Sequence, residues 1–263
     1  MNQMRRKTPL ERIKITYSFF GKKLGRPVFK YRTAKASKKH SKPIQSLLNY
    51  YKNNMNNLED LILSGQNMGL LLEFLETTKD LEGNILELGT YKGGSTIMFA
   101  KFLQHLKSKK RIFACDTFTG FPYEDIDPTE QKRIGNLRDT SFEHVSEKFK
   151  KFNVSDKITI IKGKFEDTLF QRLSDLKFSF VLFDADLYKS TKFALDFVYP
   201  RLINDGIMAF QDYELGNEKI KKFAWGERQA VDEFFSLHNL KLSTEKSIPY
   251  FQLKNIENVD KNF

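Results

Sequence analysis

The feature that most constrains the fold of this chain is the alternation of short apolar segments with longer amphipathic ones after residue 80. Residues 84–88, 111–115, 158–161, 178–183 and 206–210 form short runs rich in Ile, Leu, Val and Phe, which is typical of buried strands. Stretches with helical periodicity separate most of them, for example residues 187–202. Strands that alternate with helices predict an α/β fold with a mostly parallel sheet and helices on both faces.

The segments at the two ends of the chain complete this organisation. Residues 46–80 predict two helices ahead of the sheet, and residues 116–140 predict a long loop. After a helix expected near residues 229–237, two strand candidates at 240–244 and 250–254 follow without a helix between them. They predict an antiparallel C-terminal edge and a sheet of seven strands. We therefore expect an N-terminal arm at 1–45, helices at 46–80 and an α/β domain at 81–263.

The charge of the chain is concentrated in the N-terminal arm. The formal net charge is +11, yet residues 1–45 hold 14 Lys and Arg residues and one acidic residue, Glu11, so the remainder is near neutral. Basic and aromatic residues alternate in the arm, a pattern that suits contact with an anionic surface and equally a solvated tail. The single cysteine, Cys115, and the lack of a signal-peptide pattern or a long apolar run predict a cytoplasmic protein, with peripheral membrane association through the arm as an alternative.

Four of the five predicted parallel strands end in an acid or an amide. These residues are Glu87, with Gly89 after it, then Asp116, then Asp184 with Asp186, and finally Gln211 with Asp212. Carboxylates are costly to desolvate, so a pair of them after a buried strand either emerges into water or forms a site. In parallel α/β sheets, ligands bind outside the carboxyl ends of the strands. The set therefore favours a functional site at this edge of the sheet.

A glycine-rich turn at residues 87–95, ELGTYKGGS, follows the first strand and differs from the dinucleotide fingerprint G-x-G-x-x-G. Asp116 lies 22 residues after Gly94 at the end of the next strand, where a carboxylate can accept hydrogen bonds from a ribose diol. A helix-capping or turn aspartate is the alternative interpretation. Glu87 beside the turn would repel a pyrophosphate but suits a ligand with an amine or a sulfonium, such as S-adenosylmethionine.

Six segments occur in a characteristic order: NILELGTYKGGS, DTFTGFP, ITIIKGKFEDTL, FDADLYKSTKFALDFVYPRL, QDY and AVDEFF. In them the chain closely resembles the macrocin O-methyltransferase family, which contains metal-dependent sugar O-methyltransferases of the class I S-adenosylmethionine fold. The resemblance covers about residues 81–255. It implies a Rossmann-like methyltransferase domain at 81–263 that methylates a hydroxyl of a sugar, a glycosylated small molecule or a glycan.

The resemblance also implies roles for individual residues. The residues expected to bind S-adenosylmethionine are Glu87, Gly89, Tyr91, Gly93, Ser95, Asp116, Thr117, Lys164 and Phe165. Asp184 would bind Mg2+ together with Gln211 and Asp212, and Asp186 would serve as the general base. A sugar hydroxyl is a poor nucleophile at neutral pH, so a hard cation and a nearby carboxylate both suit the reaction. The family usually has two acids at 211–212, and the uncharged Gln211 therefore predicts weaker metal binding.

Other interpretations remain open from the sequence. An Asp-x-Asp pair at a strand end also occurs in metal-dependent glycosyltransferases, and the basic arm could make the chain a methyltransferase-like module that binds nucleic acid or an anionic membrane surface. Residues 121–140 and 221–229 are the expected acceptor walls, where Trp225 either stacks on a sugar or anchors the packing. The four histidines have no metal-ligand spacing and receive no role. A homo-oligomer is a further expectation.

Overall fold

The sheet of the computed structural model has six strands within the described residues, which are 40–58, 65–121, 130, 137–213 and 225–254. The strands are β1 (Asn84–Leu88), β2 (Ile112–Asp116), β3 (Ile158–Lys162), β4 (Phe178–Phe183), β5 (Leu202–Phe210) and β6 (Tyr250–Gln252). Their order is β3-β2-β1-β4-β5-β6, with the first five parallel and β6 antiparallel to β5. The predicted parallel sheet with an antiparallel edge is confirmed.

The prediction of a seventh strand at residues 240–244 is wrong. This segment contributes a single antiparallel bridge between Ser243 and Tyr250, closed by backbone hydrogen bonds of 2.9 and 3.0 Å. The neighbouring strand β6 is three residues long and uses its other edge to pair with β5, so little backbone is left for a longer ladder.

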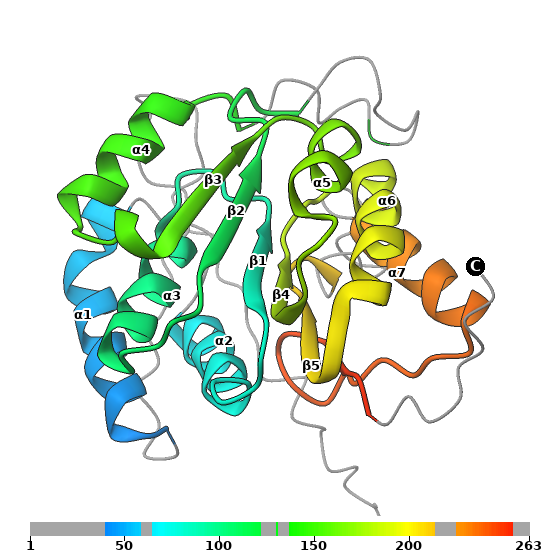
Figure 1. Ribbon diagram of the computed structural model, residues 1–263, viewed down its shortest axis with the longest axis horizontal. Helices are drawn as coiled ribbons and strands as arrows, with labels where there is room; N and C mark the ends of the chain where they lie inside the picture. Colours follow the sequence, from blue (N-terminus) through cyan, green and yellow to red (C-terminus); the bar gives the residue numbers. More distant parts are fainter. Residues whose placement is uncertain (1–39, 59–64, 122–129, 131–136, 214–224, 255–263) are drawn as a thin grey trace, which may run out of the picture.

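Seven helices of the described chain cover the two faces of the sheet (Figure 1). They are α1 (Lys42–Leu58), α2 (Gly65–Thr77), α3 (Gly94–His105), α4 (Phe142–Lys151), α5 (Phe165–Leu173), α6 (Tyr188–Val198) and α7 (Trp225–Leu237), with short 3-10 turns η3 (Ser155–Lys157) and η4 (Tyr199–Arg201). Helices α1, α2, α3 and α4 pack on one face of the sheet through one apolar core. Helices α5, α6 and α7 pack on the other face through a second core. Alternate residues of each strand enter opposite cores, since successive side chains of a strand point to opposite faces.

Strand β4 shows this arrangement most clearly, because all six of its residues are buried. Phe180 and Leu182 belong to the core under α1–α4, whereas Val181 and Phe183 belong to the core under α5–α7. A strand buried on both faces should be almost entirely apolar, which fits five of the six residues of FSFVLF. The exception, the buried Ser179, accepts a hydrogen bond of 3.0 Å from Nζ of Lys110. The first polar side chains after it therefore emerge at its carboxyl end.

The sheet reverses its direction of growth between β1 and β4, which are neighbours at its centre. The segments that follow these two strands start in close contact, since the N–H of Asp184 donates to the carbonyl of Leu88 at 2.9 Å. Gly89 has a positive φ of 96°, and a Cβ there would collide with the carbonyl oxygen of Asp184. Glycine is thus required where the two strand ends separate to leave a crevice, the usual ligand position of such folds.

The two helices predicted ahead of the sheet are present as α1 and α2, and α1 begins at Lys42, inside the segment assigned to the basic arm. Residues 1–39 of that arm lie outside the described residues, so its contact with an anionic surface stays a prediction. Among the described residues, no helix is long and apolar enough to cross a lipid bilayer.

Candidate active site

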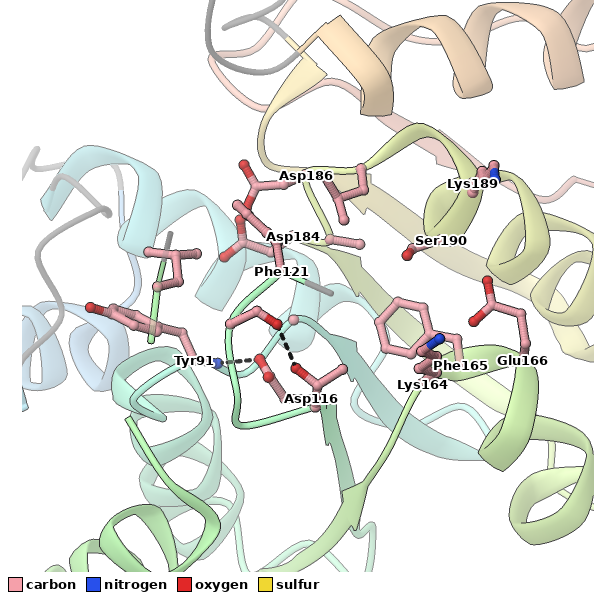
Figure 2. Close-up of a pocket in the computed structure, with 16 residues that line it drawn as sticks. Tyr91, Asp116, Phe121, Lys164, Phe165, Glu166, Asp184, Asp186, Lys189 and Ser190 are labelled. Atoms are coloured by element: carbon pink, nitrogen blue, oxygen red, sulfur yellow. Dashed lines mark hydrogen bonds between the residues drawn. The ribbon is translucent and has the colours of Figure 1, made fainter. Parts of the chain in front are cut away.

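An open cavity of about 850 Å³, including its solvent-facing mouth, lies at the carboxyl ends of the parallel strands. Its walls come from the segments that follow β1, β2, β3 and β4 and from the first turn of α6. The predicted site residues among its lining are Gly89, Tyr91, Asp116, Thr117, Lys164, Phe165, Asp184 and Asp186. Figure 2 shows Asp184 and Asp186 side by side on one wall, with Tyr91 and Asp116 below them and Lys164 and Phe165 at the far side.

Asp116 is held in place by the backbone on both sides. Its Oδ2 accepts a hydrogen bond of 2.7 Å from the N–H of Tyr91, and its Oδ1 accepts one of 2.7 Å from the N–H of Phe118. Burial raises the pKa of Asp116, and these two N–H groups oppose that shift. The backbone N–H of Thr90 and the side chain of Thr117 also act on this carboxylate. Asp116 lines the cavity, and its ribose-binding role stays a prediction.

Tyr91 connects the turn after β1 to the segment ahead of α4. Its hydroxyl donates to Oδ1 of Asp139 at 2.6 Å, and the neighbouring Lys92 Nζ lies 3.0 Å from Oδ2 of the same carboxylate. The hydroxyl of Thr140 donates to the Tyr91 carbonyl at 2.9 Å. Tyr91 also has a positive φ of 48°, so these contacts hold a turn that a tyrosine seldom adopts. They give the cavity mouth a defined shape.

Three predicted cofactor residues lie behind the cavity wall. The carboxylate of Glu87 is fully buried and accepts hydrogen bonds from the hydroxyls of Ser95 and Thr96 in the first turn of α3. Gly93 has a positive φ of 74°, and a Cβ there would strike the ring of Phe149 in α4. These residues set the shape of the glycine-rich turn, and their direct contact with a cofactor stays a prediction.

The acids that follow β4 and β5 approach one another. Asp184 and Asp186 line the cavity, and Asp186 has a positive φ of 63° in a tight turn. The N–H of Gln211 donates to the carbonyl of Phe183 at 2.9 Å, which aligns the end of β5 with the end of β4. Gln211 and Asp212 are 7% and 3% exposed and lie behind the lining residues. Burial, followed by the charges of Asp186 and Asp184, raises the pKa of Asp212 well above its ordinary value.

Glu227 in the first turn of α7 is a fourth carboxylate at this place, and the sequence analysis did not identify it. It is 0% exposed, and its Oε1 accepts a hydrogen bond of 3.0 Å from the N–H of Asp212. Burial, and next the charge of Asp186, raises the pKa of Glu227 to about 8. An acid in the first turn of a helix is ordinary, so its spacing carries no signal for a site.

The chemistry of these side chains fits a hard divalent cation. All the candidate donors are oxygens, which Mg2+ prefers. Among the described residues, Oε1 of Gln211 and Oε2 of Glu227 are buried acceptors without a hydrogen-bond partner. No three Asp, Glu, His or Cys side chains in this part of the chain converge as a finished cation cage. The donor set is therefore suitable in kind, whereas the predicted Mg2+ site is not shown.

The predicted acceptor walls fall partly outside the described residues. Residues 122–129, 131–136 and 221–224 lie outside them, as does the side chain of Trp225, so its stacking role stays a prediction. Phe121 and Leu137 are described and line the cavity. Both carboxylate oxygens of Glu130 accept a hydrogen bond of 3.2 Å from the N–H of Tyr188, the first residue of α6, so Glu130 caps this helix. The histidines, predicted to have no role, do not line the cavity.

Comparison with known proteins agrees with this geometry. Residues 65–245 match the sequence profile of the macrocin O-methyltransferase (TylF) family, and the chain belongs to that family. It is 28% identical over 141 residues to 8-demethyl-8-(2,3-dimethoxy-alpha-L-rhamnosyl)-tetracenomycin-C 4'-O-methyltransferase of Streptomyces olivaceus, a match of 51% of this chain and 54% of that protein. The chain thus spans about half the length of the characterised relatives it matches.

Solved structures show the same fold. The O-methyltransferase NovP superposes with a TM-score of 0.66 at 20% identity and covers 81% of this chain and 97% of its own. The SAH-bound methyltransferase PaMTH1 of Podospora anserina superposes with a TM-score of 0.52 at 18% identity, with 84% and 92% covered. The predicted class I methyltransferase fold and the predicted family are both confirmed.

Proposed function

We propose that this protein is an S-adenosylmethionine-dependent O-methyltransferase whose acceptor is a hydroxyl of a sugar, a glycosylated small molecule or a glycan. The observation that carries the proposal is the cavity itself. Asp116, at the end of β2, and Asp186, after the end of β4, both line it. One carboxylate is suited to a ribose and the other to a reacting hydroxyl. Family membership and the rhamnose-linked name of the Streptomyces olivaceus relative support this substrate class.

The cofactor would lie along the ends of β1, β2 and β3. Asp116 lines the cavity at the end of β2, where its carboxylate would accept the ribose hydroxyls. Thr117 is fixed beside it because its hydroxyl donates to the Gly120 carbonyl at 3.0 Å. Lys164 and Phe165 at the start of α5 border the region assigned to adenine. The turn containing Gly89 and Tyr91 would enclose the methionine end. The SAH-bound PaMTH1 structure, which has the same fold, supports this cofactor class.

Asp186 is the proposed general base. Methyl transfer from a sulfonium is an in-line displacement in which the acceptor oxygen bonds to the methyl carbon as the carbon–sulfur bond breaks. The acceptor proton passes to the Asp186 carboxylate, which lines the cavity, and S-adenosylhomocysteine leaves. Holding both reactants in one cavity removes the entropic cost of bringing them together during the reaction.

Asp184, Gln211 and Asp212 would hold a divalent cation, normally Mg2+, beside this base. When bound, the cation would lower the pKa of the acceptor hydroxyl and orient it. The close approach of the Asp184, Asp186 and Asp212 charges supports a cation here, since a positive ion relieves their mutual repulsion.

The proposal is tested with S-adenosylmethionine labelled in its methyl group. The purified protein is incubated with the labelled cofactor, Mg2+ and a set of free, nucleotide-linked and glycosylated sugars, and then with a cell extract. We expect a labelled product whose methyl ether maps to a sugar hydroxyl, absent from Asp186→Asn. Nucleotide-sugar binding without S-adenosylmethionine binding would favour the glycosyltransferase alternative. Binding of RNA or anionic vesicles without cofactor binding would favour the surface-binding module.

The N-terminal arm and the assembly of the chain are separate proposals. We expect residues 81–263 to form the methyltransferase domain, residues 1–45 to contact an anionic surface, and the chain to form a homo-oligomer. Deletion of residues 1–39 should abolish vesicle or RNA binding and leave cofactor affinity unchanged, because the cavity lining begins at Gly89. Vesicle binding that survives the deletion would place the contact elsewhere, and light scattering measures the oligomer.

A further inference from the structure

Position 211, at the end of β5, holds an uncharged glutamine among three aspartates. Gln211 is the first residue after β5, next to the buried Asp212 and beside the segment with Asp184 and Asp186. Its amide oxygen is an acceptor but carries no formal charge, which weakens the attraction of this position for a divalent cation. At the end of β5, the proposed cation site would therefore have one acid, Asp212, and not two.

Glu227 reaches the same place from α7 and contacts both strand ends. Its Oε1 accepts the N–H of Asp212 at 3.0 Å, and its own N–H donates to the carbonyl of Asp186 at 3.2 Å. The adjacent Gly226 permits this approach, since a Cβ there would collide with the carboxylate of Glu130 and lie 2.5 Å from the N–H nitrogen of Tyr188. Glu227 is thus in position to affect the orientation of Asp186 and Asp212 together.

The backbone N–H groups of Asp212, Ala185 and Tyr213 act on the Glu227 carboxylate, yet its second oxygen has no hydrogen bond of its own among the described residues. Oε2 is buried and without a hydrogen-bond partner, and so is Oε1 of Gln211. Buried polar atoms in folded proteins are nearly always satisfied by protein, water or an ion. The Gln211 oxygen can only accept, and Oε2 of Glu227 can only accept while its carboxylate is ionised, so in that state a cation would satisfy both atoms. Among the described residues, neither Asp212 nor Glu227 forms an ion pair with a basic side chain that would fill this role.

We propose that Glu227 supplies, from α7, the negative charge that Gln211 does not carry, as a positioning carboxylate for a divalent cation held with Asp184 and Asp212. This inference rests on the metal-assisted function proposed above and adds a residue to it. The carboxylate holds Asp212 through its backbone and completes the charge of the cation site. Gln211 then offers a neutral oxygen, and the negative charge beside it comes from Glu227 on α7 instead of from a second acid on β5.

The test measures Mn2+ binding directly, by the loss of the free-ion electron paramagnetic resonance signal on titration of the purified protein. Glu227→Gln keeps the shape of the side chain and removes its charge, so we expect Mn2+ affinity to fall about 10–100-fold. The matched control is Asp196→Asn, which removes one charge from an exposed position of α6 and should leave the affinity unchanged. Unchanged Mn2+ affinity in a folded Glu227→Gln protein would overturn the proposal.

A charge-relocation variant separates a charge role from a packing role. Gln211→Asp in the Glu227→Gln background returns the charge to β5 and should recover Mn2+ affinity to within about threefold of the original protein. If the double variant binds no better than Glu227→Gln alone, Glu227 acts only through packing and the proposal is wrong. If Glu227→Gln does not fold, Gln211→Asp alone decides: it should tighten Mn2+ by less than about threefold, because the charge is already present.

The same samples distinguish this inference from the proposed function. S-adenosylmethionine affinity by calorimetry should be equal in Glu227→Gln, Asp196→Asn and the unaltered protein, since Glu227 does not line the cavity. If the unaltered protein binds no Mn2+ yet binds S-adenosylmethionine and methylates an acceptor, the role of Glu227 fails and methyl transfer stands. If it neither binds S-adenosylmethionine nor methylates, the proposed function fails as well.

Discussion

The backbone N–H of Tyr91 donates a hydrogen bond of 2.7 Å to Oδ2 of Asp116, joining the turn after β1 to the end of β2 across 25 residues of sequence. The same carboxylate accepts the N–H of Phe118, so one side chain orders two loops of the cavity. Asp116 therefore holds two loops of the cavity, and the proposed contact with a ribose would be its second function. Substitutions there should affect both the loops and the cofactor.

Asp116→Ala should weaken S-adenosylmethionine binding at least about tenfold, which corresponds to about 1.4 kcal/mol. The variant loses both the charge-assisted bonds to the ribose and the anchor of Tyr91. Calorimetry measures the effect, with Asp205→Asn as the control, because Asp205 is a half-buried residue of β5 that pairs with Lys254 at 2.7 Å and does not line the cavity. Equal affinity of Asp116→Ala and the unaltered protein would remove Asp116 from the cofactor site.

Asp184→Asn and Asp186→Asn should fail in different ways. Asn tolerates the φ of 63° at position 186, so the second variant should fold, bind metal and cofactor, and lose about 10²–10⁴ in rate at any metal concentration. Asp184→Asn should regain part of its rate as Mg2+ or Mn2+ is raised, because a lost ligand weakens binding and leaves the base in place. Steady-state rates across a metal titration separate the two. A chelator without effect on the unaltered enzyme would exclude the metal role of Asp184.

Gly89→Ala should lower the free energy of unfolding by about 2–4 kcal/mol and also impair cofactor binding. The added Cβ would meet the Asp184 carbonyl at a φ of 96°, so β1 and β4 would have to separate. Gly65→Ala is the matched control, since nothing lies within 4 Å of a Cβ there, and we expect a change below about 1 kcal/mol. Urea unfolding measures both. Equal effects of the two changes would contradict the close approach at Gly89.

The stability of the metal-free protein should decrease as pH rises from about 5 to 8. Burial and the Asp186 charge raise the pKa of Glu227 from 4.5 to about 8, and the pKa of Asp212 is raised as well. Between these values the folded protein keeps a proton that the unfolded chain releases. The free energy of unfolding then falls by at most about 1.4 kcal/mol per pH unit for each such group.

Urea unfolding in EDTA at several pH values measures this slope. Glu227→Gln should flatten it, because glutamine does not titrate, and added Mg2+ should raise the stability at pH 8 in the unaltered protein. Identical pH profiles for the variant and the unaltered protein would show that Glu227 titrates with an ordinary pKa.

The parallel sheet and the position of the cavity were predictable because both depend on local pattern and topology. The FSFVLF run of β4 is apolar at every position except Ser179, a pattern typical of a strand covered on both faces. Parallel strands then bring their carboxyl ends to one edge, so Asp116, Asp184 and Asp186 had to meet once the strands were identified.

What the sequence determined by itself was therefore the α/β class, the family and the edge that carries the site. Only the tertiary structure decided that residues 240–244 make one bridge, that Glu87 pairs with Ser95 and Thr96, and that Glu227 enters the acidic cluster. The physical reason is that burial and pairing depend on which surfaces meet. Glu227 follows Asp212 by 15 residues and resembles any acid in a first helical turn until the packing of α7 excludes water from it.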